Sequence, residues 1–142
     1  MHAPLTEPEI ERIGRGLIER TLPKIEWTHT AHFAAAFWLL RHPEHDAFAE
    51  MPQLIRHYNE STGVANTDSG GYHETITVAS LRAARAWLDA RPSVSIAAAL
   101  AEFLASAFGK SSWPLAYWSR ACLFSVEARR SWVEPDRRPL PF

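Results

Sequence analysis

The sequence has little of several features that would assign a protein to a special class. Only one of its 142 residues is a cysteine, Cys122, which excludes an internal disulfide framework and fits a reducing compartment. Its 15 lysine and arginine residues nearly balance its 16 aspartate and glutamate residues, so the formal net charge is −1. Without a positive field or a basic stripe, the chain is not expected to bind nucleic acid.

Long apolar runs are also missing. The longest, residues 33–40, is far shorter than the roughly 20 residues that a helix needs to cross a bilayer. The N-terminal segment is acidic and lacks the basic start and apolar run of a secretory signal. These absences predict a cytoplasmic protein with no membrane partner.

What the chain does contain is helical periodicity. Its 46% hydrophobic and 22% charged residues are the balance of an ordinary globular domain, and no segment alternates with the period of two that marks a strand. We therefore predict an all-α fold, a single bundle of about six helices that takes up residues 1–142 as one domain. A glycine-rich loop is expected at about 61–71 and an extended tail from about 135.

Start and stop signals place the six helices. Thr6 and Glu9 have the form of a capping box, and the helix that they open should end near Pro23. The second helix is apolar on nearly all sides, which is typical of a central, buried helix. The later helices are expected at about 48–58, 72–90, 95–108 and 114–132, after a second helix at 27–41. Four arginines near the C-terminus are mixed with acidic residues, which predicts a solvated, salt-bridged end: Arg129, Arg130, Arg137 and Arg138.

Histidines at two helix starts are the pattern that points to chemistry. His29 and His32 are three residues apart and share one face of the second helix, while His73 and Glu74 open the fourth helix directly after the loop. If these helices pack side by side, the three imidazoles can hold a divalent metal ion and leave one position open. Zinc or iron fits best, and nickel or copper also suits nitrogen ligands. Glu74 would act as a general base or ligand, or would stabilise the helix start electrostatically.

Polar groups around this cluster predict a lined cavity. The face that follows His73 carries Ile76, Thr77 and Ser80, which mixes apolar groups with hydroxyls. The groups that would orient a small-molecule substrate or ligand are Tyr58, Asn59, Asn66 and Thr77.

Structural roles are the alternative for the same residues. Each histidine can instead donate to a carbonyl or carboxylate, which would make the cluster a buried network holding the second and fourth helices in register. The tryptophans at helical spacing are most simply core packing, and Cys122 is most simply a buried, inert thiol. A homo-oligomer is compatible with six tryptophans and seven phenylalanines in so short a chain.

The two histidine motifs also carry a resemblance. Trp27-Thr28-His29-Thr30-Ala31-His32 and Tyr72-His73-Glu74-Thr75-Ile76-Thr77 resemble the aromatic-x-His-x-x-His and Tyr-His-Glu-Thr-Ile-Thr motifs of a group of small uncharacterised bacterial proteins of unassigned activity. The C-terminal segments 125–129 and 132–136 are similar to that group's ending. The resemblance implies that the two motifs form one site, but it names neither an ion nor a substrate.

Two functions follow as hypotheses. In the first, the chain is a metal-binding protein and a metal-dependent enzyme that acts on a small molecule by hydrolytic, lyase or oxidative chemistry. In the second, it is a non-catalytic helical ligand-binding or interaction domain with a structural histidine and glutamate network.

Overall fold

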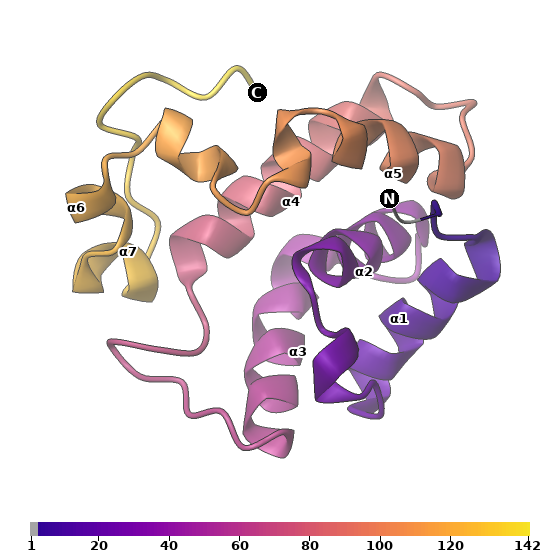
Figure 1. Cartoon of the computed structure of the whole chain (residues 1–142), viewed down its shortest axis with the longest axis horizontal. Coiled ribbons are helices and arrows are strands. Elements are labelled where there is room, and N and C mark those ends of the chain that lie inside the picture. The colour runs from indigo at the N-terminus through magenta and orange to yellow at the C-terminus, as the bar shows by residue number, and fades with distance from the viewer. Residues whose placement is uncertain (1–2) are drawn as a thin grey trace.

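The computed structural model describes residues 3–142 and shows seven α-helices, three short 3₁₀ helices and, within that range, no strand (Figure 1). This confirms the all-α prediction. In chain order the elements are α1 (Glu7–Glu19), η1 (Lys24–Glu26), α2 (His29–Arg41), α3 (Ala47–Ser61), α4 (Glu74–Asp89), α5 (Ile96–Ala105), η2 (Ala107–Gly109), η3 (Trp113–Ala116), α6 (Arg120–Leu123) and α7 (Val126–Arg130). In the described part of the chain, no helix is long and apolar enough to cross a membrane.

Hydroxyl caps set where the helices begin. The capping box of Thr6 and Glu9 is present at α1, where the Thr6 hydroxyl accepts from the Glu9 amide and the Glu9 carboxylate accepts from the Thr6 amide. Thr28 caps α2 and Ser95 caps α5 in the same way, each accepting an amide three residues later. Such caps satisfy amides that the first helical turn leaves without partners.

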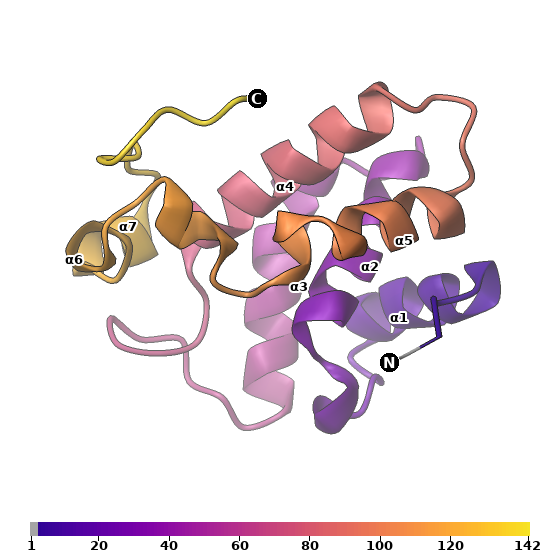
Figure 2. The ribbon, with the colours of Figure 1, turned by 45° about the horizontal axis from the view of Figure 1, so that its top comes forward.

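The second helix is central, as its apolar composition predicts. It contacts α1, α3, α4 and α5, which surround it (Figures 1 and 2). Its Phe33 and Phe37 meet Phe103 of α5 at ring-centroid distances of 4.6 and 5.1 Å, in edge-to-face arrangements. The main core therefore lies along α2, and every other long helix buries one face against it.

Helix α1 approaches α2 closely at Gly14. A Cβ atom at this position would lie 2.5 Å from Cε3 of Trp38, whose side chain is buried. Only glycine permits this separation without a shift of the indole.

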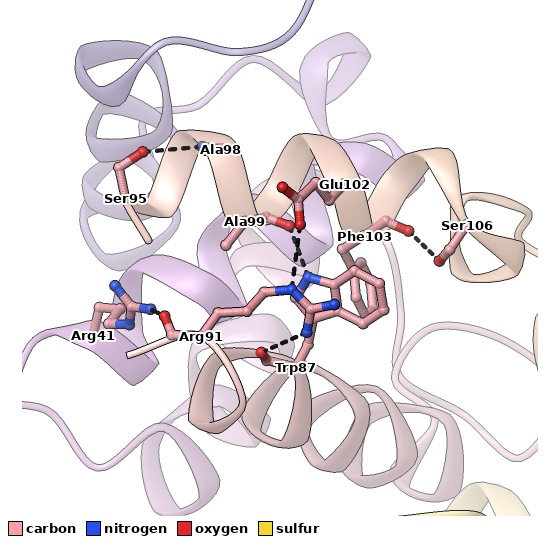
Figure 3. A network of polar contacts seen from close by, with 9 residues as sticks. All are labelled: Arg41, Trp87, Arg91, Ser95, Ala98, Ala99, Glu102, Phe103 and Ser106. Atoms are coloured by element: carbon pink, nitrogen blue, oxygen red, sulfur yellow. Dashed lines mark hydrogen bonds and ion pairs between the residues drawn. The ribbon is translucent and has the colours of Figure 1, made fainter. Parts of the chain in front are cut away.

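A polar network joins the turn between α4 and α5 to its neighbours (Figure 3). Arg41 at the end of α2 donates to the carbonyls of Arg91 and Val94, at 2.8 and 2.9 Å. Arg91 lies over the Trp87 indole, 3.7 Å from its centroid, and donates to the Glu102 carboxylate. The Trp87 indole N–H in turn donates to the Ala99 carbonyl at 3.0 Å. The network ties the end of α2 and the side chains of α4 and α5 to this turn, whose Arg91 carbonyl also accepts from the Val94 amide.

The predicted single helix over 114–132 is wrong. The chain there forms η3, α6 and α7 in succession, because two serines restart it: Ser119 accepts from the Cys122 amide and Ser125 from the Ala128 amide. Serine side chains compete for backbone groups in this manner, so they favour helix starts over helix interiors.

The tail after Pro135 is irregular and packs against this broken segment. The Asp136 carboxylate accepts from the amide and the hydroxyl of Ser119, both at 2.6 Å. The Arg137 amide donates to the Tyr117 carbonyl at 2.8 Å, and the Arg137 and Arg138 guanidinium groups donate to the carbonyls of Leu115 and Ala116.

The expectation of a solvated end is confirmed for Arg130, Arg137 and Arg138, which are exposed, but of the four arginines only Arg130 forms a salt bridge in the described chain. Arg137 and Arg138 bind backbone carbonyls, as does Arg129, which donates to Gly71 and Tyr72. Arg130 pairs with Asp68 in the irregular segment 62–73 that links α3 to α4. Arg129 and Arg130 thus tie α7 to the segment that links α3 to α4, while Arg137 and Arg138 tie the tail to η3.

Candidate functional site

A pocket of about 250 Å³ opens where α2, α3, α4 and the segment around η3 meet. We call it the histidine pocket. The residues that line it are His29, His32, Phe33, Ala36, Met51, Ile55, Ile76, Thr77, Ser80, Leu81, Ser111 and Trp113. Two imidazoles and three hydroxyls interrupt a wall that is otherwise apolar, and none of these described lining residues is a lysine, arginine, aspartate or glutamate.

His29 stands at the first position of α2. Its Nε2 lies 2.9 Å from the Phe108 carbonyl oxygen, and because a carbonyl only accepts, this nitrogen carries the hydrogen. The ring also meets Phe33 edge-on, at 5.1 Å between centroids. The hydrogen bond ties α2 to η2 and orients the imidazole at the rim of the pocket.

His32 lies one turn further along the same face. Its Nδ1 donates to the Thr28 carbonyl at 2.8 Å, and its ring packs on the indole of Trp27 at 3.8 Å between centroids. Desolvation among these groups lowers the pKa of His32 to about 4, against a smaller raising effect of the Thr28 carbonyl and with a further lowering from His29. The ring is therefore neutral at physiological pH.

The second nitrogen of the His32 ring is a polar atom of the pocket without a hydrogen-bond partner in the described part of the chain. With Nδ1 protonated, Nε2 of the neutral ring carries a lone pair and has no hydrogen-bond partner among residues 3–142. No fully buried side-chain nitrogen or oxygen in that range lacks a partner, so solvent can reach this atom. The wall thus offers an accessible hydrogen-bond acceptor.

His73 does not join the other two histidines. It is the N-cap of α4, where its Nδ1 accepts from the Ile76 amide at 3.2 Å, and its Nε2 donates to the Leu123 carbonyl at 2.7 Å. Both ring nitrogens are occupied, and the residue does not line the histidine pocket. Burial, the largest cause, lowers the pKa of His73, which keeps the ring in this neutral form.

Glu74 also lies outside the pocket. Its carboxylate accepts from the Tyr72 hydroxyl at 2.5 Å, and burial followed by this interaction raises the pKa of Tyr72. The Glu74 carboxylate therefore contacts Tyr72, two residues away in the sequence, rather than His29 or His32.

Three of the four predicted ligand-orienting residues have structural partners instead. The Tyr58 hydroxyl donates to the Leu22 carbonyl at 2.7 Å. Asn59 donates to Asn66, which itself accepts from the Tyr72 amide and donates to the Arg56 carbonyl. Of the four, only Thr77 lines the histidine pocket.

The three predicted metal ligands are thus divided between two places. His29 and His32 share the pocket, whereas His73 joins α4 to α6. Over residues 3–142 the structure contains no group of three or more histidine, cysteine, aspartate or glutamate side chains that could hold a metal ion.

The face of α4 that follows His73 lies where its sequence pattern predicts. Ile76, Thr77 and Ser80 do line the pocket, as the mixed character of that face predicts. The sequence did not place Met51, Ile55 or Ser111 in the site, because Met51 and Ile55 come from α3 and Ser111 from the segment before η3, and only the packing of these elements brings them to the histidines. The tryptophans pack in or against the core, and Cys122 is partly buried with its pKa raised by desolvation.

Comparison of the chain with protein-family models, with curated proteins and with solved structures gave no match. The function has to be inferred from the pocket itself.

Proposed function

We propose that this protein binds a small, predominantly apolar organic molecule in the histidine pocket. The observation that carries the proposal is the composition of the wall, in which a few polar groups interrupt an apolar surface drawn from three helices and a distant loop. Small-molecule sites are typically built this way, with apolar walls for affinity and few polar groups for orientation.

The size of the pocket supports a ligand with one ring. A dry, apolar cavity of roughly 150 Å³ is enough to hold benzene, and ordinary ligand pockets begin at roughly 300 Å³. At about 250 Å³ the histidine pocket lies between these values. It has room for an aromatic ring with one or two short substituents.

Small side chains create this space. Ala36 on α2 and Ser80 on α4 face the pocket, where larger residues would fill it. Protein interiors are otherwise close-packed, with few voids larger than a water molecule. Ligand binding explains why small residues occupy these two lining positions.

Binding is proposed in preference to metal-dependent catalysis because of where two residues lie. The enzyme hypothesis needs His73 as a ligand and Glu74 as a base beside His29 and His32. Both have other partners, the Leu123 carbonyl and the Tyr72 hydroxyl, and neither lines the pocket.

Titration with ethylbenzene, followed by amide NMR, tests the proposal. We expect saturable shifts confined to residues of the pocket, such as His29, His32 and Thr77, and a ligand-dependent rise in melting temperature. Ala36→Leu should abolish them by filling the space, whereas Ala105→Leu, the same change at the exposed end of α5, should not.

Ser80→Leu fills the pocket from α4 instead of α2, and it replaces Ala36→Leu in the experiment if that variant does not fold. Absence of saturable shifts in the wild type both with ethylbenzene and with its hydroxylated analogue 4-ethylphenol would overturn the proposal. So would binding that is as strong in a folded pocket-filling variant as in the Ala105→Leu control.

A further inference from the structure

The N–H groups of both pocket histidines donate to backbone carbonyls. His29 donates through Nε2 to the Phe108 carbonyl, and His32 donates through Nδ1 to the Thr28 carbonyl. Since carbonyl oxygens cannot donate, these contacts show which ring nitrogen carries the hydrogen. The second nitrogen of His32, whose ring is kept neutral by burial, is then an acceptor.

From this arrangement we infer that the ligand carries a neutral hydrogen-bond donor, a phenolic or alcoholic hydroxyl, and that this hydroxyl donates a hydrogen bond to Nε2 of His32. The inference rests on the proposed function and specifies the chemical class of molecule that the histidine pocket takes.

His32 is the residue that favours a ligand with a hydrogen-bond donor. Its Nε2 is accessible to solvent and has no hydrogen-bond partner among residues 3–142. The Trp27 indole, 3.8 Å away between centroids and tilted by 31°, packs against the ring and restricts its orientation. An acceptor that is fixed in this way favours a molecule that can donate to it, and it penalises an apolar one that would leave it desolvated.

Negatively charged ligands are disfavoured by the same wall. A buried carboxylate or phosphate needs a compensating cation, and the described lining residues include neither a lysine nor an arginine. Neutral His32 would present a lone pair to the anion. A phenol or alcohol meets no such penalty, since it is neutral at physiological pH.

The hydroxyls of the wall complete the arrangement. Thr77 and Ser80 of α4 and Ser111 near η3 line the pocket together with His32. A hydroxyl group both donates and accepts hydrogen bonds. These side chains can therefore donate to the oxygen of a ligand hydroxyl while that hydroxyl donates to His32. The pocket is therefore suited to a hydroxyl, which has one hydrogen to give and lone pairs to receive.

A matched pair of probes tests the inference. 4-Ethylphenol and 4-ethyltoluene have the same ring and nearly the same volume, but only the first can donate. Their Kd values are measured by amide NMR titration in the presence of EDTA, in the wild type and in His32→Phe, which keeps an aromatic ring against Trp27 and removes the acceptor. His57→Phe, the same change at an exposed position, is the control.

The quantity compared is the Kd of 4-ethyltoluene divided by that of 4-ethylphenol, because a ratio cancels the difference in pocket shape between proteins. We expect this ratio to fall about tenfold in His32→Phe, the size of one net hydrogen bond, and to be unchanged in His57→Phe. The anion 4-ethylbenzoate should bind more weakly than either probe.

Three results would overturn the inference and leave the proposed function in place: both probes bind with a ratio that is the same in His32→Phe, 4-ethylbenzoate binds as tightly as 4-ethylphenol, or the imidazole ¹⁵Nε2 signal of wild-type His32 does not move when 4-ethylphenol saturates. The last result needs no variant and decides the question if His32→Phe fails to fold. If no probe binds the wild type at all, the proposed function itself fails.

Discussion

The imidazole of His73 connects the start of α4 to the carbonyl of Leu123 at the end of α6, at a distance of 2.7 Å and across 50 residues of sequence. The same ring caps α4 through its other nitrogen, which accepts from the Ile76 amide. One buried side chain thus stabilises both a helix start and the attachment of the C-terminal segment.

Replacement of His73 should therefore cost two interactions at once. We expect His73→Ala to lower the free energy of unfolding by about 2 to 3 kcal/mol, from a lost cap and a buried carbonyl left unpaired. His73→Asn should recover part of this loss, because asparagine is a good N-cap that is too short to replace the imidazole at Leu123. Urea denaturation measures both. His57→Ala, at an exposed position, is the control, and an equal loss there would contradict the assignment.

Stability should fall as the solution becomes mildly acidic. In the folded state the pKa of His32 is about 4 and that of His73 is lowered, both chiefly by burial, whereas an unfolded histidine takes up its proton near pH 6.5. Below about pH 6.5 the unfolded state thus binds more protons than the folded state, and stability that is fully present above that pH is lost toward pH 4. Each such group can contribute a slope of up to about 1.4 kcal/mol per pH unit.

Urea denaturation between pH 7.5 and pH 5 measures this slope. His32→Phe should flatten the curve because one of the two groups is gone, while His57→Phe should leave it unchanged. A wild-type curve that is level down to pH 5 would contradict the burial of both rings.

The close approach of α1 and α2 should reverse the usual effect of a glycine-to-alanine change. Within a helix this substitution normally stabilises by about 1 kcal/mol. At Gly14 the added methyl group would lie 2.5 Å from the buried Trp38 ring, so we expect a net loss of about 1 to 3 kcal/mol. Gly70→Ala is the control, since the nearest atom to its added carbon is 3.9 Å away and its φ is not positive. Thermal unfolding compares the two, and a stabilised Gly14→Ala would refute the packing.

Asp136 should hold the C-terminal tail in place. Asp136→Ala removes the acceptor for both the amide and the hydroxyl of Ser119, whose hydrogen bonds also lower the pKa of that carboxyl group. We expect the amides of Ser119 and Arg137 to exchange with deuterium several-fold faster, because the tail detaches more often. Glu134→Ala, in the same tail, removes only the acceptor of the Trp132 indole and should leave both amides protected.

Local chemistry made much of the helical layout predictable. The capping box at Thr6 and the apolar composition of 33–40 depend on neighbours within a few residues, so they indicate helix starts and a central helix without knowledge of the fold. The same holds for the mixed face of Ile76, Thr77 and Ser80, which does line the pocket. Where local signals compete, as at Ser119 and Ser125, the periodicity of 114–132 was misleading, because hydroxyl capping and the bound tail outweigh it.

The sequence by itself determined that His29 and His32 act from one helical face, because their spacing and the helix geometry require it. Only the tertiary structure decided what surrounds them. The Phe108 carbonyl accepts a hydrogen bond from His29, and the Leu123 carbonyl accepts one from His73, which therefore lies against α6. Ser111 and Trp113 complete the wall of the pocket from a distant segment. The physical reason is that a side chain's hydrogen-bond partner is set by the packing of remote elements, which no local pattern contains. In the folded chain the histidine pair therefore lies in the wall of a mostly apolar pocket, apart from His73.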